Sequence, residues 1–325
     1  MSPPAPPDPR PPVVVVTGPT ASGKSELALE LALRFGGEIV NADSMQVYRH
    51  LDIGTAKPSP AERARVPHHL LDVVAPDAAY SAGRYAADAR RACAEVHGRG
   101  RVVLLTGGTG LYIRALLEGL LGAGEADPAL RERLEREHAE ACAAGDPGLL
   151  HRRLAALDAE GAAATHPHDL RRVVRALEIA AHAGRAPSEL RRAHGFGERR
   201  YRVLHLALDP GRADLDARIR ERCRRMVEGG LLQEVRGLRQ LGYGPALRPL
   251  QAIGYRHLNA VAEGRDTLAS ALEAMDRDTR RFARRQRTWL RGVPEARWMH
   301  PGERARIAEL VESFLAGEGA RRYAV

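Results

Sequence analysis

Cysteine is scarce in this sequence, with three residues in 325. Cys93, Cys142 and Cys223 form no CxxC pair and no cluster with histidines. This spacing argues against a disulfide framework and against a structural zinc site. We therefore expect three free thiols that are buried in the protein.

Long apolar stretches are also missing, and no run approaches the roughly 20 residues that a membrane-spanning helix needs. The N-terminal stretch MSPPAPPDPRPP has the layout of neither a signal peptide nor a transit peptide. We expect residues 1–12 to be a disordered proline-rich tail of a cytoplasmic protein. The hydrophobic share of 44% is ordinary for a globular protein and allows a sizeable core.

Lysine is nearly absent, because only Lys24 and Lys57 interrupt the arginines among 50 basic residues. The net charge of +9 favours an anionic partner, nucleic acid first. Where arginine serves almost everywhere, a surviving lysine marks a place that needs a compact ammonium rather than a broad guanidinium. Chance survival is the alternative. Lys57 lies in DIGTAKP, which we expect to be an ordered loop, and its role stays open.

The stretch VVVVTGPTASGKSE combines a β-branched run, a glycine loop and the start of a helical pattern. The run is typical of a strand buried on both faces of a parallel sheet. The loop fits G-x-x-x-x-G-K-[ST] between a strand and a helix, which predicts a phosphate-binding loop. We expect Lys24 to reach the phosphates and the Ser25 hydroxyl to bind Mg²⁺. The predicted pyrophosphate-binding residues are Gly18, Pro19, Thr20, Ala21, Ser22, Gly23, Lys24 and Ser25.

A P-loop ATPase also needs a carboxylate at the end of a second strand. The buried run RVVLLT ends in Gly107, Gly108 and Thr109 instead, whereas Asp43 follows the strand that finishes at Ile39 and Val40. Ligands of doubly wound sheets bind at the carboxyl ends of the strands, so Asp43 and Thr109 should meet the P-loop there. An Asx-turn or helix cap at Asp43, and a turn hydroxyl at Thr109, are the alternatives.

Seven ordered blocks, from about Val13 to about Met299, resemble the tRNA dimethylallyltransferase family, also called isopentenyl-tRNA transferase. They are GPTASGKS, NADSMQVYRHLDIGTAKP, VPHHLLD, LTGGTGLYIRALLEGL, HPHDLRRVVRALEI, QAIGYR and RRQRTWLRG. The C-terminal stretch has no ligands for the zinc finger of some eukaryotic members, so the likeness is to the bacterial type. The resemblance implies transfer of a dimethylallyl group from dimethylallyl pyrophosphate to N6 of the adenosine 3′ of a tRNA anticodon.

The resemblance also implies roles for single residues. Asp43 matches the family's general base, Thr109 a threonine that contacts the target nucleotide, and Arg218 and Arg222 the arginines that meet the pyrophosphate. Together with Lys24 these are the expected catalytic residues. An allylic pyrophosphate ionises when its leaving group is stabilised, and the poorly nucleophilic adenine amine must lose a proton, so this chemistry suits the P-loop and Asp43.

The expected tRNA contacts follow the same blocks. Arginines at helical spacing are often only a solvated face, so it is the block match that favours RNA. The expected contacts are Asp43, Ser44, Met45, Gln46, Arg131, Arg171, Arg172, Val173, Val174, Arg175, Gln251, Ala252, Ile253, Gly254, Tyr255, Arg256, Arg284, Arg285, Gln286, Arg287, Thr288, Trp289, Leu290 and Arg291. On the last helix Arg280, Arg284, Arg287 and Arg291 would form a cationic stripe, with Phe282 and Trp289 as core anchors on another face.

The predicted fold class is α/β: a P-loop NTPase-like parallel sheet flanked by helices, with an all-helical insert. We expect residues 13–120 and 201–315 to form the catalytic core with a basic C-terminal helix. Residues 121–200 would form the insert, which resembles the family's clasp for the tRNA anticodon stem-loop. A monomer is expected.

Two other functions compete with this interpretation. A P-loop small-molecule kinase would use the same loop for ATP and Asp43 to activate a hydroxyl, but it leaves the arginine-rich insert without purpose. A nucleotide-gated RNA-binding protein without chemistry leaves the strand-end carboxylate unexplained. In the favoured interpretation ATP binds weakly or only through its phosphates.

Overall fold

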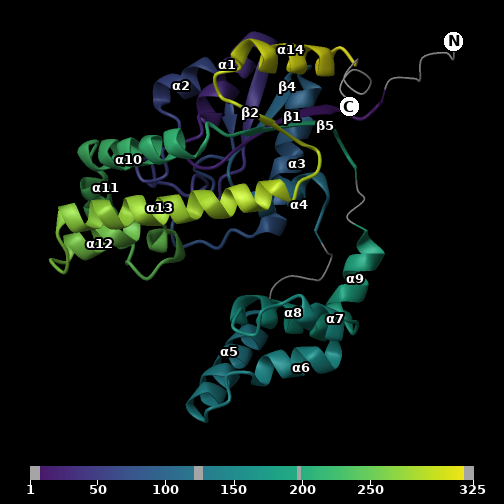
Figure 1. Cartoon of the computed structure of the whole chain (residues 1–325), viewed down its shortest axis with the longest axis vertical. Helices are drawn as coiled ribbons and strands as arrows, with labels where there is room; N and C mark the ends of the chain where they lie inside the picture. The colour runs from purple at the N-terminus through teal and green to yellow at the C-terminus, as the bar shows by residue number, and fades with distance from the viewer. Residues whose placement is uncertain (1–7, 121–126, 196–198, 318–325) are drawn as a thin grey trace. The chain divides into compact units, whose positions relative to one another are not determined.

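A computed structural model describes residues 8–120, 127–195 and 199–317 of the chain (Figure 1). Contacts divide the chain into two compact units, one of residues 1–117 and 199–325 and one of residues Glu118–Glu198. Positions 121–126 and 196–198 of the expected insert lie outside the described residues, as do positions 1–7 of the expected tail. Residues 8–12 are placed, and the Arg10 guanidinium donates a hydrogen bond to the carbonyl of Arg199.

The first unit is built on a parallel six-stranded sheet in the order β3-β2-β4-β1-β5-β6. This confirms the predicted α/β class. The central strand β1 pairs on one side with β4 and on the other with β5, so that Val13 lies between Val103 and Val203. The strands are β1 (Pro12–Thr17), β2 (Gly37–Asn41), β3 (His68–His69), β4 (Val102–Thr106), β5 (Arg202–Leu208) and β6 (Ala296–Met299).

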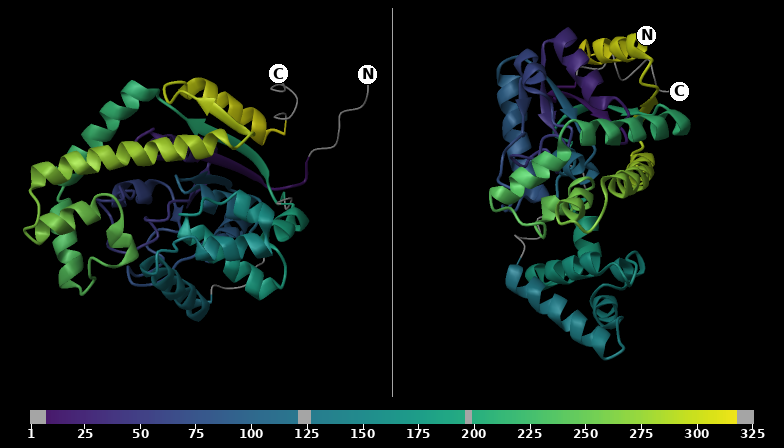
Figure 2. Two further views of the ribbon diagram at one scale, coloured as in Figure 1. Left: turned by 60° about the horizontal axis from the view of Figure 1, so that its bottom comes forward. Right: turned by 90° about the vertical axis from the view of Figure 1, so that its left-hand side faces the viewer.

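The β-branched run of β1 supplies both faces of the sheet, because alternate side chains point to opposite sides. Val14 and Val16 pack into one core with Leu27 of α1 and Val311 of α14, whereas Val13 and Val15 pack into another core with helices of the opposite face. Both views of Figure 2 show helices on both faces of the sheet. The first layer holds α1 (Lys24–Phe35) and α14 (Arg304–Leu315).

The opposite layer carries the helices that surround the site. They are α3 (Ala82–Gly98), α4 (Gly110–Leu117), α10 (Arg212–Glu228), α11 (Leu231–Gln240), α12 (Tyr255–Ala262) and α13 (Leu268–Arg291). The short helices α2 (Pro60–Arg65) and η1 (Arg248–Gln251) lie in connections. Within the described ranges no helix combines the length and the apolar character that crossing a membrane requires.

The second unit is helical in its described residues and has a small core of its own. Leu134, Leu150, Leu154, Val173 and Leu177 form the centre of that core. Its helices are α5 (Pro128–Ala143), α6 (Leu149–Leu157), α7 (Ala159–Ala163), α8 (Leu170–Ala183) and α9 (Pro187–His194). Asp169 caps α8 by accepting a hydrogen bond from the Arg172 amide.

The three cysteines are free, but the expectation that all are buried is wrong for one of them. Cys93 and Cys223 are buried, whereas Cys142 is exposed. Its helix α5 has only two buried residues, Leu134 and Ala141, so the position after Ala141 already faces solvent.

Candidate active site

The glycine loop after β1 has the backbone of an anion-binding loop. Gly18 has a φ of 151°, and a Cβ there would come within 2.4 Å of the Ser22 hydroxyl and 2.7 Å of the Leu208 carbonyl. Gly23, with a φ of 90°, starts α1 without a side-chain cap from any described residue. The amide groups of the first turn are therefore available to an anion, which the positive end of the helix dipole favours.

Lys24 bends back over this loop, and its Nζ donates to the Pro19 carbonyl at 3.3 Å. Burial, together with the nearby Arg222, lowers the pKa of the Lys24 ammonium to about 8, although Asp43 opposes this shift. A bound pyrophosphate would reverse this shift by pairing the ammonium with negative charge.

Asp43 follows β2 and uses one carboxylate oxygen to shape its own turn. Its Oδ1 accepts from the Met45 amide at 2.8 Å, and its amide donates to Asn41 Oδ1 at 3.0 Å. The alternative of an Asx-turn is thus present in the structure. The second oxygen, Oδ2, accepts no hydrogen bond from any described residue. The turn therefore orients the carboxylate and leaves Oδ2 available to accept a proton.

The ends of β2 and β4 are joined directly beside Asp43. The Ser44 amide donates to Thr109 Oγ1 at 2.9 Å, and the Thr109 amide donates to the Ala42 carbonyl at 3.1 Å. A Cβ at Gly107 would lie only 2.3 Å from the backbone of Ala42. The Thr109 hydroxyl is therefore a link between two strand ends, a role that the sequence alternatives did not include.

The two arginines of α10 occupy different environments near the P-loop. Arg222 is half-buried, its Nη2 lies 3.5 Å from the Thr55 carbonyl, and burial lowers the pKa of its guanidinium while Asp43 opposes that shift. Arg218 is exposed, with its Nη1 3.7 Å from the place that a Cβ on Gly23 would take. Arg222 therefore lies near Lys24 and Arg218 near Gly23, and both Lys24 and Gly23 belong to the predicted pyrophosphate-binding loop.

One cavity of about 390 Å³ collects most of the expected site residues of the first unit. Its polar lining mixes a cationic side around Lys24 and Arg222 with the carboxylate of Asp43. The expected residues that line it are Thr20, Lys24, Ser25, Asp43, Ser44, Met45, Gln46, Thr109, Arg222, Gln251, Ala252, Ile253, Tyr255, Arg256, Arg285 and Gln286. The expected Gly18, Pro19, Ala21, Ser22, Gly23, Arg218, Gly254, Arg284, Arg287, Thr288, Trp289, Leu290 and Arg291 belong to the same unit but not to this lining.

Gln286 of α13 is mostly buried, borders the cavity and holds the P-loop. Its Oε1 accepts from the Thr20 amide at 2.8 Å, and its Nε2 donates to the Gly108 carbonyl at 3.1 Å. The same helix reaches the end of β5, since Arg287 pairs with Asp209 at 2.5 Å. Helix α13 thus ties the ends of three strands together.

Two members of the expected stripe of four arginines on α13 form ion pairs with acids of the protein. Arg280 pairs with Asp276 at 2.6 Å and Arg287 with Asp209, whereas Arg284 and Arg291 are exposed. The i,i+4 spacing of Asp276 and Arg280 could have indicated the first pair, whereas Asp209 lies 78 positions from Arg287 and could not be found from spacing.

The expected core anchors on α13 divide as well. Trp289 is partly buried and packs so closely on α4 that a Cβ at Gly110 would lie 2.2 Å from its ring. Phe282 is 37% exposed and lines the cavity, so it is not a core anchor.

Four other expected tRNA contacts have buried side chains, and among them only Tyr255 borders the cavity. Val173 and Val174 belong to the insert core, and Leu290 is 2% exposed. The Tyr255 ring is fully buried, and its hydroxyl donates to Glu234 at 2.6 Å. These positions support the exposed residues beside them in the same sequence blocks.

In the insert, two expected contact residues share one buried acid. The Glu178 carboxylate is inaccessible to solvent, and its Oε2 accepts from Arg131 at 2.8 Å and from Arg175 at 3.2 Å. Arg171 and Arg172 on the first turn of α8 are exposed. The insert therefore carries several arginines at its surface, and the buried Glu178 fixes the positions of two of them, Arg131 and Arg175.

Three residues near the reacting side chains were not identified from the sequence. Asn41 orients Asp43, Glu234 holds the DIGTAKP loop, and Phe282 lines the cavity. Asn41 could have been found, because it ends a buried strand two residues before the carboxylate. Glu234 carries no local signal, since its helix has an ordinary amphipathic pattern.

Comparisons with known proteins agree with this geometry. A family model described as IPP transferase matches residues 46–293. The chain is 48% identical over 309 residues to a tRNA dimethylallyltransferase of Desulfosudis oleivorans, covering 94% of this chain and 96% of the relative. It is 48% identical over 304 residues to one of Geobacter metallireducens, covering 93% and 97%.

Solved structures give the same result. A tRNA delta(2)-isopentenylpyrophosphate transferase of Staphylococcus epidermidis matches with a TM-score of 0.68 and 33% identity, over 94% of this chain and 99% of that one. A eukaryotic dimethylallyltransferase acting on tRNA matches with a TM-score of 0.78 and 28% identity, over 94% and 80%. The predicted family is confirmed and the kinase alternative is set aside. The chain belongs to the IPP transferase family, the family of the tRNA dimethylallyltransferases.

Proposed function

We propose that this enzyme transfers a dimethylallyl group from dimethylallyl pyrophosphate to N6 of the adenosine that follows the anticodon of a tRNA. The observation that carries the proposal is the cavity lined by Lys24, Arg222 and Asp43, whose Oδ2 accepts no hydrogen bond from any described residue. The two cations suit an anionic leaving group, and the carboxylate suits a group that gives up a proton.

The proposed step breaks the bond between the allylic carbon and the pyrophosphate oxygen and forms a bond from that carbon to N6. The electron pair of the broken bond leaves with pyrophosphate, and Lys24, Arg222 and the P-loop amides stabilise the charge that develops there. Asp43 takes the proton that N6 loses. All atoms of the two substrates are accounted for in prenylated tRNA, pyrophosphate and the proton on Asp43.

The donor set at the P-loop suits Mg²⁺, which prefers hard oxygen ligands. The Ser25 hydroxyl is exposed at the cavity lining, where pyrophosphate oxygens and water could complete a coordination shell. When bound, Mg²⁺ would neutralise part of the charge on the leaving group.

The tRNA would be held by exposed arginines of both units. The exposed arginines of the expected set are Arg171 and Arg172 of the insert, Arg256 of α12, and Arg284, Arg285 and Arg291 of α13. Arginine contacts to phosphates position the RNA without reading its sequence, so selectivity would come from the adenosine admitted to the cavity.

Nucleoside mass spectrometry of unmodified tRNA tests the proposal. We expect a dimethylallyl mass gain on adenosine after incubation with the enzyme, Mg²⁺ and dimethylallyl pyrophosphate. A parallel reaction with ATP and small hydroxyl acceptors should give no phosphorylated product. No mass gain on any tRNA, or productive phosphoryl transfer from ATP, would overturn the proposal.

A further inference from the structure

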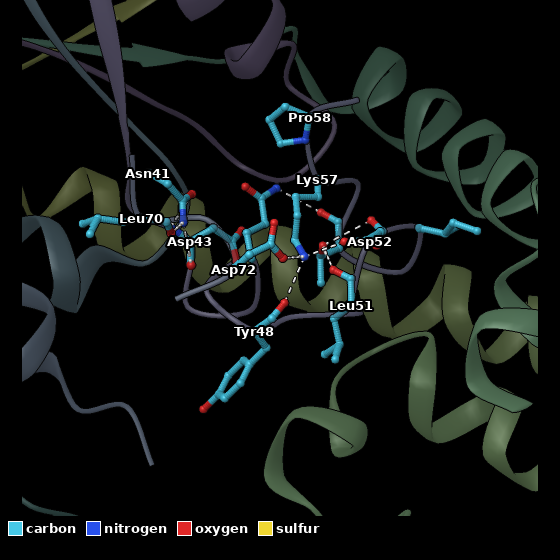
Figure 3. A network of polar contacts seen from close by, with 12 residues as sticks. Asn41, Asp43, Tyr48, Leu51, Asp52, Lys57, Pro58, Leu70 and Asp72 are labelled. Atoms are coloured by element: carbon cyan, nitrogen blue, oxygen red, sulfur yellow. Dashed lines mark hydrogen bonds and ion pairs between the residues drawn. The ribbon is translucent and has the colours of Figure 1, made fainter. Parts of the chain in front are cut away.

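Lys57 is buried in the loop of residues 51–58, and the reaction proposed above gives it no task. Its side chain is only 1% exposed. The ammonium donates to the Tyr48 carbonyl at 2.9 Å, to Asp52 at 2.5 Å and to Asp72 at 2.7 Å (Figure 3). Three acceptors match the three donors of an ammonium group, so the buried charge is fully satisfied.

Two of these acceptors fix the position of residues 44–48, the segment that follows Asp43. Tyr48 is the last residue of this segment, and Lys57 donates directly to its carbonyl. Asp72 donates its backbone amide to the Gln46 carbonyl at 3.2 Å, so Lys57 also holds Gln46 through Asp72. The turn that aims the Asp43 carboxylate is therefore anchored at its far end by one buried cation.

The remainder of the loop has a separate anchor. The carboxylate of Glu234 accepts from the amides of Asp52, Ile53 and Gly54 at 2.7 to 3.2 Å. The next residue, Thr55, offers its carbonyl to Arg222. Glu234 therefore holds the amides of residues 52–54, whereas Lys57 holds the Tyr48 carbonyl and Asp72.

We propose that Lys57 is a positioning residue that sets where the Asp43 carboxylate meets the acceptor adenosine, while pyrophosphate binding is held independently. This inference rests on the proposed function. It also explains the choice of lysine at this position in a chain where 48 of the 50 basic residues are arginine. Three acceptors around one nitrogen fit a compact ammonium, whereas a planar guanidinium would need a wider site.

The test compares Lys57→Met and Lys57→Arg with the wild-type enzyme in two measurements. The first is kcat for prenyl transfer to tRNA, and the second is the affinity for inorganic pyrophosphate with Mg²⁺ by calorimetry. We expect kcat to fall by about 100-fold in Lys57→Met, the effect of a misplaced reacting group, with pyrophosphate affinity unchanged. Lys57→Arg should not restore kcat.

Arg63→Met is the matched control. Arg63 pairs with the other oxygen of Asp72, at 2.7 Å, and donates to the Pro58 carbonyl, and neither of these bonds involves residues 43–48. Its loss should leave kcat at the wild-type value. An equal loss of kcat in Arg63→Met would mean that any positive charge beside Asp72 is sufficient, which would contradict a specific role for Lys57.

A second pair of variants decides the matter if Lys57→Met does not fold. Asp72→Asn should lower kcat without loss of pyrophosphate affinity, whereas Asp52→Asn, at a side chain that is 60% exposed, should not. Wild-type kcat in Lys57→Met, Lys57→Arg or Asp72→Asn, or an equal loss of pyrophosphate affinity, would overturn the inference. Failure of the wild-type enzyme to prenylate tRNA would instead overturn the proposed function.

Discussion

Among single residues, Lys24 is the one whose positive charge is destabilised by folding, because the ammonium is buried. Bound pyrophosphate would stabilise that charge again. Burial brings the pKa of its ammonium down from the ordinary value of 10.5 to about 8. The unfolded chain therefore binds more protons between pH 8 and 10.5, so this group contributes a stability term that rises with pH across that window. Below pH 8 both states are protonated and the full cost of burying the charge is present.

The same shift predicts that pyrophosphate binding takes up protons above pH 8. Pairing with the anion raises the pKa of Lys24, so the apo enzyme must gain a proton as it binds, and affinity must fall as pH rises from 8 to 10. Calorimetry in buffers of different ionisation enthalpy measures this uptake. Lys24→Met removes the contribution of Lys24 and keeps that of pyrophosphate itself, so equal uptake by both proteins would contradict the prediction.

At the scale of elements, Gln286 makes α13 part of the pyrophosphate site. We expect Gln286→Leu to weaken pyrophosphate binding and to destabilise the fold, because it strands the Thr20 amide and the Gly108 carbonyl at a cost of about 1–3 kcal/mol each. Urea unfolding and pyrophosphate calorimetry measure the two effects. The control is Glu273→Ala at an exposed position of the same helix, and a similar effect in both variants would argue against the clamp.

The junction of β2 and β4 leaves no room for a side chain at Gly107. We expect Gly107→Ala to push the Asp43 turn away from Thr109, to lower kcat and to cost about 1–3 kcal/mol of stability, as overpacking does. Gly98→Ala is the control, since a Cβ there meets nothing within 4 Å. The free energy of unfolding in urea decides, and a harmless Gly107→Ala would show that the strand ends can separate.

Strand β1, the P-loop and helix α1 could be predicted from the sequence, because a β-branched run followed by this glycine pattern is compatible with few other local structures. Asp43 was identifiable from its place after a strand. The role of Gln286 was not, because its partner Thr20 lies 266 positions away and its neighbours are arginines. The burial of Val173 and Val174 could have been predicted from the apolar spacing of α8. They were instead assigned to the tRNA contacts, because the whole sequence block resembles an RNA-contact block of the family. Strand β6 has four residues and no distinct signal.

At the scale of the whole molecule, the charge of +9 should make tRNA affinity depend steeply on salt. Six exposed arginines stand in the expected contact set, and each phosphate contact contributes about −0.9 to the slope of log K against log salt for a duplex. We expect a slope of about −5 by filter binding, reduced by about 1 in Arg284→Ala. Arg34→Ala, an exposed arginine on α1 beside Glu312, should leave the slope unchanged. Equal slopes in all three proteins would contradict contact through α13.

The central claim is that Asp43 is the base, and Asp43→Asn tests it most directly. Asparagine keeps an oxygen for the Met45 amide and so preserves the turn, but it cannot take a proton from N6. Single-turnover prenyl transfer to tRNA should fall by roughly 100-fold or more in this variant, while the same preparation binds pyrophosphate like the wild type. Transfer at the wild-type rate would contradict the account, because the proton would then leave by another route.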